Sequence, residues 1–428
     1  MSTTIGWAMA QNLPLKDFRW LSQQEIDALD IVSCDIEGKT GYVLEVDLDY
    51  PEHLHDLHND YCLAPERLLP SHNILSTYQR ELKNKLNIPK NTTQKLIPNL
   101  LPKTKYTLHF KNLQLYLKNG LILKKIHRVV SFTQERWLKP YIDFNTEKRK
   151  AAKTPEEKDA FKLFVNSVFG RSCMNIRKHR DVRIVHDTRR AKNLIAKPNY
   201  STYQIINDDL VAINMKKTHI FWNKPTFLGF SILDISKTLM YQYHYDHILP
   251  LYGDKAKLLL TDTDSFIYHI HTEDLYDDMR RNLDVYDTSD YDACHPCYSK
   301  TNCKVLGKFK DECGGIPAVE FIGLRSKMYS VQLDESGRTK HTAKGIKKST
   351  ANTLTHANYK ACLQEHTTNN VTFNTIKSSN HTLKTTKIVK SGLNPFDDKR
   401  YLRPDSHDTW AYGHWRTKED EEEETVRQ

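Results

Sequence analysis

LLLTDTDSFIYHI, residues 258–270, is the stretch from which the fold is predicted. Its two apolar runs, separated by a polar turn, predict two antiparallel strands with Asp262 and Asp264 at the tip between them. Two carboxylates placed together can share hard divalent cations such as Mg²⁺, and a pair of such ions stabilises the attacking and leaving oxygens of phosphoryl transfer. An ordinary solvated turn is the alternative, because Asp and Thr are common in turns.

KDAFKLFVNSVFGR, residues 158–171, has the periodicity of a helix. Lys162, Asn166 and Phe169 fall at i, i+4 and i+7, so they lie on one stripe. A nucleoside triphosphate needs a cation for its phosphates and a flat apolar surface for its base, and Gly170 allows a close backbone approach. A plain amphipathic helix with a solvated lysine is the alternative. In either case we expect the opposite stripe in the core, formed by Phe161, Phe164, Val165 and Val168.

FIGLRSKMYSV, residues 321–331, predicts a strand. With a period of two, Arg325, Lys327 and Tyr329 share one face, and the apolar residues between them share the other. A basic and aromatic face suits a nucleic-acid backbone. Such alternation is also normal on any half-exposed strand.

The charge of the chain favours a phosphate-rich partner. Its 428 residues include 63 Lys and Arg against 53 Asp and Glu, and residues 419–424 are all acidic, so the rest is more basic than the net charge of +10. Lysine and arginine bind nucleic acid by displacing its counterions, and a membrane surface is the competing explanation. No apolar run approaches the ~18–20 residues that span a bilayer, and no signal peptide is evident. We expect a soluble intracellular protein with no membrane partner. If the source is a eukaryote, the nucleus is a possible location.

Other segments predict individual strands and turns and, together, the fold class. Residues 41–50 predict a strand closed by Pro51, and Lys118-Asn119-Gly120 predicts a hairpin turn between two strands. The histidines at positions 53, 55 and 58 are expected at the surface. Strands and helices mixed without βαβ regularity predict an α+β protein.

The cysteines are expected to be mostly reduced core residues, because a chain of this length does not need disulfides. Four of them have an approximate metal-binding spacing, but only the first pair matches the tight knuckle of a structural zinc site. Zinc binding is therefore left open for Cys294, Cys297, Cys303 and Cys313.

Three motifs together resemble, in order and spacing, signature motifs of family B DNA polymerases. The resemblance is closest to the protein-primed branch of bacteriophages, adenoviruses and Maverick (Polinton) transposons. The first motif of that family ends in Tyr-Gly, so Phe169 keeps the ring and loses the hydroxyl. The motifs are K162-xxx-N166-S167-x-F169-G170, D262-T263-D264-S265 and K327-M328-Y329. Residues 41–61, 139–152, 305–312 and 400–415 look specifically like the Maverick group.

The resemblance implies a role for each matching residue. Asp262 and Asp264 would be the catalytic, metal-binding aspartates for two Mg²⁺ ions. Lys162 would bind the incoming deoxynucleoside triphosphate, and Asn166, Phe169 and Gly170 would line the pocket of the nascent pair. One of Lys148, Arg149 and Lys150 would also contact the triphosphate, and which one is left open. Template and primer DNA would be the partners, with Arg325, Lys327 and Tyr329 holding the primer.

The resemblance also implies a right-hand architecture. The palm would comprise residues 1–51, 116–136 and 226–335, the fingers 137–175, and the thumb and C-terminal region 336–418, followed by an acidic tail at 419–428. Insertions of the protein-primed branch, at 52–115 and 176–225, would grip a terminal protein primer and encircle the template.

One carboxylate of the family site is unaccounted for. In the Maverick group the preceding motif reads roughly Asp-x-Asn-Asn-Leu-Tyr-Gly-Trp-Ala-Met, and residues 6–9 match its end. Its aspartate would precede Met1, Ile5 replaces its tyrosine, and Asp47 is not expected to substitute. We therefore expect an N-terminally truncated DNA-directed DNA polymerase of a mobile element or virus, without an exonuclease domain and with little activity alone. A non-catalytic DNA-binding remnant of a transposon polymerase is the alternative.

Overall fold

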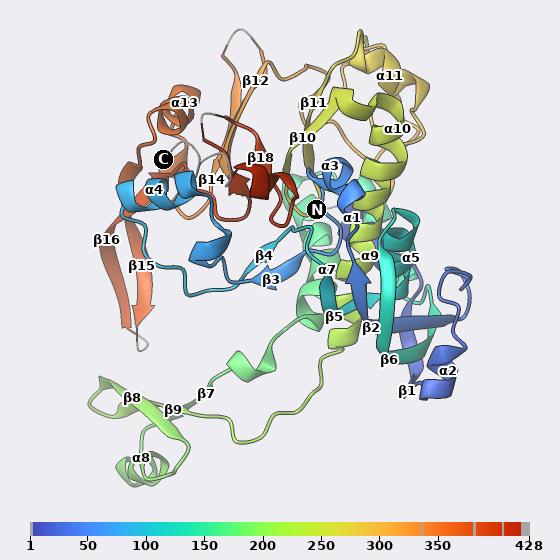
Figure 1. The fold of residues 1–428 in the computed structure, drawn as a ribbon. Coiled ribbons are helices and arrows are strands. Elements are labelled where there is room, and N and C mark those ends of the chain that lie inside the picture. The colour runs from blue at the N-terminus through green and yellow to red at the C-terminus, as the bar shows by residue number, and fades with distance from the viewer. Residues whose placement is uncertain (1–2, 335–336, 380–381, 405, 421–428) are drawn as a thin grey trace.

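The computed structural model describes residues 3–334, 337–379, 382–404 and 406–420 (Figure 1). It is a mixture of helices and mainly antiparallel strands, as the sequence predicts. The acidic run at 419–424 lies largely outside the described residues. Among the helices that are described, none combines the length and the apolar character that crossing a membrane requires.

A four-stranded antiparallel sheet forms the base of the molecule. Its order is β1 (Leu13–Trp20), β6 (Ile122–Glu135), β2 (Thr40–Asp49) and β5 (Lys103–His109). Alternate residues of β2 are buried, as expected for a strand with one face in a core. This face packs beneath α5 (Phe110–Lys118) and α9 (Thr226–Gln242), and the core that they share includes Leu44, Val46, Leu48, Leu113, Tyr116 and Tyr241.

The predicted hairpin at residues 118–120 is wrong, because helix α5 occupies the chain between β5 and β6. The run LQLYL alternates like a strand, but the residues at 110, 113 and 116 also repeat at helical spacing, and all three are buried. Gly120 has φ +94 and ends the helix, since its amide donates to the carbonyl of Leu117. β5 and β6 consequently pair with opposite edges of β2 and not with each other.

Four helices pack together next to this sheet. α1 (Thr3–Met9) and α7 (Pro155–Ser172) pack against α9, and α6 (Lys139–Ala151) packs against α7 and α1. α7 begins at Thr154, whose hydroxyl accepts from the Glu157 amide at 3.2 Å. The buried residues of this group include Ile5, Met9, Ile142, Val165, Leu228 and Ile232.

Residue Gly307 joins a distant loop to the helix group. It has φ +85, and a Cβ at this position would lie 2.6 Å from the ring of Trp7. Only glycine allows the loop to approach the indole this closely. Leu306 packs against the same helices, so this part of the loop is fixed to α1.

The helix α9 continues through a π-helical turn (Tyr243–Ile248) and α10 (Leu249–Tyr252) towards the β10–β11 hairpin. The hairpin consists of β10 (Ala256–Thr261) and β11 (Phe266–Ile270), followed by α11 (Leu275–Arg281). A second sheet then has the order β12 (Glu320–Arg325), β13 (Met328–Gln332) and β14 (Thr339–Ala343). α12 (Lys348–Ala351), α13 (His356–Gln364) and a long hairpin of β15 (Asn369–Ser379) and β16 (Thr382–Leu393) complete this lobe.

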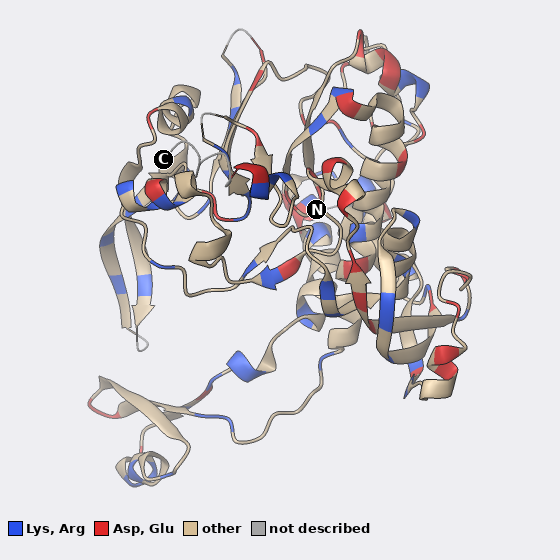
Figure 2. Cartoon of the chain, viewed as in Figure 1, with Lys and Arg blue, Asp and Glu red and all other residues tan. Residues whose placement is uncertain are grey.

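Residues 176–225 form a small module that stands away from the body on two connecting segments (Figure 1). α8 (Thr188–Ile195) covers a sheet of β7 (Asp181–Val185), β9 (Leu210–Met215) and β8 (Tyr200–Asn207). The 176–225 segment has eleven Lys and Arg against four Asp. Its β8 strand touches the first residue of β16, where the Gln204 side-chain amide donates to the Thr382 hydroxyl. Lys and Arg recur along both α8 and this hairpin (Figure 2).

Residues 50–100 pack against the C-terminal segment. The elements are α3 (His55–His58), β3 (Glu66–Leu68), α4 (Thr77–Lys85), β4 (Lys95–Ile97), β17 (Tyr401–Leu402) and β18 (Thr409–Trp410), whereas α2 (Gln23–Asp27) lies between β1 and β2 and packs into the core of the central sheet. Their shared core includes Leu75, Leu82, Ile97, Phe396, Tyr401 and Tyr412.

Arg400 holds these two segments together. Its guanidinium donates to the Asn59 carbonyl at 2.8 Å, to the Asn59 side-chain oxygen at 3.1 Å and to the Thr409 carbonyl at 2.9 Å. Asn59 also binds the C-terminal segment directly, because its side-chain oxygen accepts from the backbone amide of Ala411 at 2.8 Å.

The prediction that the 53–58 histidines lie at the surface is wrong for two of the three. His55 and His58 are 6% and 0% exposed, while His53 is exposed. The 3.6-residue period of α3 turns residues 55 and 58 inward, where the Tyr50 hydroxyl lies 2.8 Å from His58 Nδ1. Burial lowers the pKa of His58 to about 4.

We predict that replacing Arg400 with Lys lowers stability by roughly 1–3 kcal/mol, because a lysine cannot reproduce the forked hydrogen bonds and leaves buried acceptors unpaired. The urea unfolding midpoint measures this change. Lys418→Gln is the matched control, since Lys418 is exposed and makes no side-chain hydrogen bond or ion pair with the described residues. Equal midpoints for the two variants would contradict the role of Arg400.

We also predict that the protein loses stability as the pH falls below 6.5. Burial lowers the pKa of His58 and His244 to about 4 and that of His109 to about 3, from the ordinary value of 6.5. The unfolded chain therefore binds protons between pH 6.5 and 4 that the folded chain does not, so acid favours unfolding. The urea midpoint should fall between pH 7 and pH 5. It should fall less in His58→Phe, and as much as in the parent chain in the exposed-site variant His53→Phe.

Candidate nucleotidyl-transfer site

The β10–β11 hairpin predicted from the sequence is confirmed, and its tip carries Asp262 and Asp264. The Asp262 amide donates to the Ser265 carbonyl at 3.0 Å and closes the turn. Thr263 adopts a left-handed conformation, with φ 60. Both aspartates are half-buried, so their carboxylates remain accessible from solvent.

An aromatic layer supports the hairpin from behind. The ring of Phe266 stacks on Tyr243 with centroids 5.8 Å apart and meets the edge of Tyr61 at 5.3 Å. The Tyr268 hydroxyl and His244 Nδ1 are 2.9 Å apart. Because these partners come from the buried π-helical turn and the 50–63 segment, the tip is built on a rigid base.

A second hairpin reaches the first, and here the sequence prediction needs correction. Residues 321–331 are not one strand, because Ser326 and Lys327 form a turn between β12 and β13. Lys327 has φ 62 and does not share a strand face with Arg325 and Tyr329. Its ammonium lies instead 2.7 Å from Asp262 Oδ1. The apolar residues Leu324 and Met328 are buried, at 5% and 1% exposed.

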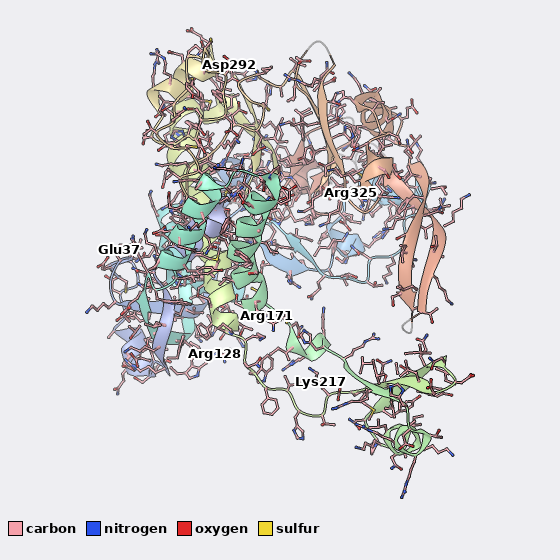
Figure 3. The ribbon with its side chains drawn as sticks, turned by 180° about the vertical axis from the view of Figure 1, so that it is seen from behind. Glu37, Arg128, Arg171, Lys217, Asp292 and Arg325 are labelled. Atoms are coloured by element: carbon pink, nitrogen blue, oxygen red, sulfur yellow. The ribbon has the colours of Figure 1, made fainter. Side chains whose placement is uncertain are left out.

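Arg325 and Tyr329 lie on the strands that flank this turn. Arg325 is exposed on β12, where Figure 3 labels it, and Tyr329 is half-buried on β13. The Tyr329 ring lies 6.1 Å from that of Phe321. Lys327 alone of the three contacts a predicted metal-binding residue among the described parts of the chain.

Helix α7 presents Lys162, Asn166 and Phe169 as half-buried residues on one stripe, as predicted. Phe169 rests against the core beside Val165 and is not directed wholly to solvent. Gly170 is exposed, and a Cβ there would meet nothing within 4 Å. The backbone at Gly170 is therefore open to a ligand.

The predicted core stripe of α7 is only partly correct. Val165 is buried and Val168 packs against the same core, but Phe164 is 47% exposed and Phe161 only half-buried. Apolar residues occur around most of the circumference of this helix, so periodicity alone does not select the face. Packing against α9 selects it.

The structure distinguishes the three cations of α6. Lys148 is exposed over the ring of Phe144 at 5.5 Å, and Lys150 pairs with Glu147 at 3.0 Å. Arg149 is half-buried on the stripe of Ile142 and makes no ion pair with any described residue. Of the three, Arg149 is thus the cation on the partly buried side of α6, and it has no counter-ion among the described residues.

Asp47 does not join the two tip aspartates. Its carboxylate accepts from the Lys105 amide at 2.7 Å and lies 2.8 Å from His127 Nε2, both on the central sheet. The backbone hydrogen bond from Lys105, followed by the bond from His127, lowers the pKa of Asp47. Within the described ranges, no three His, Cys, Asp or Glu side chains are close enough to hold a metal ion together.

Asp262 and Asp264 nevertheless suit Mg²⁺ as a pair. This ion is bound through one or two protein carboxylates, and waters and substrate phosphates fill its other positions. The ammonium that lies on Asp262 Oδ1 shows that this oxygen faces a position where a cation is accommodated.

No three of the four cysteines with metal-like spacing form a group that could hold a metal ion among the described residues. Cys297 is fully buried, and its thiol donates to the Tyr276 carbonyl at 2.9 Å. Cys294 is exposed. Cys297 packs in the small core of the 271–315 segment beside Met279 and Tyr291.

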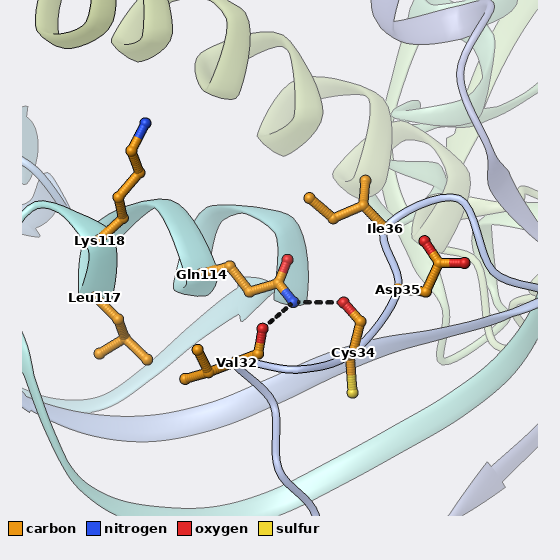
Figure 4. A pocket seen from close by; sticks show the side chains of 7 residues that line it. All are labelled: Val32, Cys34, Asp35, Ile36, Gln114, Leu117 and Lys118. Atoms are coloured by element: carbon orange, nitrogen blue, oxygen red, sulfur yellow. Dashed lines mark hydrogen bonds between the residues drawn. The ribbon is translucent and has the colours of Figure 1, made fainter.

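A groove of about 730 Å³ lies elsewhere, between α5 and residues 32–36 (Figure 4). Gln114 fixes its wall by donating to the carbonyls of Val32 and Cys34 at 3.3 and 2.8 Å. Neither hairpin contributes to its lining.

Comparison with known proteins gives a result only at the level of structure. No protein-family model matches the chain, and no curated protein matches it. Phi29 DNA polymerase in its ternary complex with primer-template DNA and incoming nucleotide superposes with a TM-score of 0.53 at 12% identity, over 92% of this chain. The orthorhombic crystal form of that polymerase gives 0.52 at 12% identity, over 92% of this chain.

The binary complex of Phi29 DNA polymerase with primer-template DNA gives a TM-score of 0.50 at 13% identity, over 91% of this chain. The match covers 56–57% of the length of the Phi29 enzyme. At this level of identity the likeness concerns the fold. The chain has a DNA polymerase-like fold over nearly all of its length.

Proposed function

We propose that this chain is the polymerising part of a DNA-directed DNA polymerase of family B, which adds deoxynucleotides to a primer on a DNA template. The observation that carries the proposal is the meeting of two hairpin tips, where Asp262 and Lys327 are in contact, within a polymerase-like fold. A phosphoryl-transfer site of this kind uses metal-binding carboxylates beside a cation for the primer backbone, and Asp262, Asp264 and Lys327 would supply these groups at this junction.

The two tip aspartates would hold Mg²⁺. When bound, the ions would neutralise the charge of the triphosphate and activate the primer hydroxyl. Arg149 and Lys162 would bind the phosphates of the incoming nucleotide, because both are half-buried cations without a counter-ion among the described residues. Asn166 and Phe169 would contact the nascent base pair, and the open backbone at Gly170 would allow it to approach.

The remaining parts of the proposal follow the sequence motifs. The α6–α7 pair would act as fingers, and the central sheet with the β10–β11 hairpin as palm. The Maverick-like stretches support a role in replicating a mobile element or virus, with a terminal protein as a further partner. Arg325 and Tyr329 flank Lys327 and would bind the primer strand with it.

A non-catalytic DNA-binding protein is the second candidate. The observation in its favour is that Asp47 is held on the central sheet, so no third carboxylate among the described residues joins Asp262 and Asp264 at a metal-binding distance. Both candidates bind DNA. They differ in whether a matched nucleotide and a divalent ion stabilise the DNA complex.

We predict that, in Mg²⁺, the deoxynucleoside triphosphate matching the template slows dissociation of a fluorescent primer-template, and that a mismatched one does not. This readout does not depend on turnover. Asp264→Asn should reduce the stabilisation at least about tenfold, because the amide cannot neutralise the ions. Asp246→Asn is the control, since Asp246 pairs with Lys118. DNA binding that is indifferent to nucleotide identity would favour the non-catalytic candidate.

We further predict that Arg149→Ala and Lys162→Ala each weaken nucleotide binding about 10- to 100-fold, the usual worth of hydrogen bonds to charged groups. The apparent Kd of the matched nucleotide in the same dissociation assay measures this. Lys148→Ala and Lys150→Ala are the matched controls one residue away, and should change the Kd less than about twofold. A larger effect at position 148 or 150 than at 149 would contradict the assignment.

A further inference from the structure

We propose that Lys327 is an internal counter-ion of Asp262 that must leave before a divalent ion can bind there, so that metal binding and DNA binding are coupled. In this view the ammonium exchanges between the Asp262 carboxylate and a phosphate of the primer strand. The inference deepens the proposed function and rests on it. It assigns Lys327 a positioning role that involves the metal site as well as the DNA.

The contact is direct and can be exchanged. Lys327 Nζ lies 2.7 Å from Asp262 Oδ1, and the two side chains are 37% and 30% exposed. An ion pair in contact with water is weak, because solvent screens it and the lysine side chain loses entropy when held. A divalent ion or a phosphate can therefore displace either partner.

The two aspartates of the tip are not equivalent. Among the described residues, Asp262 has Lys327 as its cationic partner, and Asp264 makes no ion pair or side-chain hydrogen bond. The other side-chain contact of Asp262 is a 3.5 Å approach of the neighbouring Thr263 hydroxyl. A metal ion that approaches the tip would therefore meet Asp264 without a counter-ion among the described residues, and Asp262 already paired with Lys327.

The backbone around Lys327 is fixed while its side chain is free to move. The Lys327 carbonyl accepts from the Lys344 amide at 3.1 Å, and the neighbouring Gly345 carbonyl accepts from Lys390 Nζ of β16 at 2.9 Å. The turn is therefore tied to β14 and to the long hairpin. Rotation of the lysine side chain alone would move the ammonium between the carboxylate and a bound phosphate.

The exchange of Lys327 between Asp262 and a phosphate couples metal binding to DNA binding. One carboxylate oxygen cannot hold the ammonium and a divalent ion at contact distance, because the two cations repel each other. A phosphate that draws Lys327 away raises the affinity of Asp262 for metal, and a bound metal must raise the affinity for DNA by the same factor.

Binding of Mn²⁺, followed by the electron paramagnetic resonance signal of the free ion, tests the proposal without any turnover. The ion whose binding is lost in Asp262→Asn defines the site. In the protein without DNA, Lys327→Gln should tighten Mn²⁺ binding roughly two- to fivefold. Lys344→Gln is the matched control, because it removes the same charge from a neighbouring exposed side chain that makes no ion pair with the described residues.

The second part of the experiment measures Mn²⁺ binding after a primer-template duplex has been added. DNA should tighten Mn²⁺ binding in the parent chain and in Lys344→Gln, and should do so less in Lys327→Gln, where no ammonium remains to be drawn away. Equal affinities of the two lysine variants without DNA, or equal gains with DNA, would overturn the coupling. Mn²⁺ binding that Asp262→Asn leaves unchanged would instead overturn the metal site of the proposed function.

Discussion

Burial of one long helix is the constraint on which the rest of the structure depends. α9 and its π-helical continuation extend from Thr226 to Ile248, and each part of this length packs against a different layer. Its first half packs against α1 and α7, its middle against the central sheet, and its end against the β10–β11 hairpin. The buried Asp234 fixes its position, because its carboxylate accepts from the amide of His109 at 2.7 Å. The hairpin with its aspartates is therefore positioned by the same helix that positions α7.

Much of the site could be predicted because its elements have strong local signals. The two apolar strands around Asp262 and the capped helix at Thr154 depend mainly on neighbouring residues, and both form as expected. Lys327 illustrates the limit. Apolar and polar residues alternate through the two-residue turn at Lys327, so the sequence pattern is the same for one long strand as for a hairpin. The contact of Lys327 with Asp262 depends on the packing of two hairpins that are distant in the sequence. The sequence leaves open which cation of α6 turns inward for a related reason, since the burial of Lys148, Arg149 and Lys150 depends on how α6 packs.

The fold was less predictable where the apolar residues of a segment fit both the two-residue period of a strand and the 3.6-residue period of a helix. Residues 110–118 suit a strand by alternation and a helix by the spacing of their largest side chains, and the apolar layer above β2 selects the helix. The inward turn of His55 and His58 likewise depends on partners far away in the chain. Tyr245 of the π-helical turn packs on the His58 ring, and the Trp415 amide donates to His55 Nδ1 at 3.2 Å. Polar residues in a short segment therefore predict a surface position only where no distant part of the chain packs over them.

The hydrogen bonds of Asn59 have a consequence for the order in which the molecule is assembled. Asn59 is bound to Thr409 and Ala411, about 350 residues later in the chain. At a synthesis rate of about 5–20 residues per second, the ribosome needs roughly 20–70 s to supply these partners after residue 59 has been made. Until then Leu75, Leu82 and Ile97 lack the aromatic residues that cover them. The 50–100 segment is therefore made early but stays incompletely packed until residues near 400 are available, and its apolar side chains need protection from aggregation during that time.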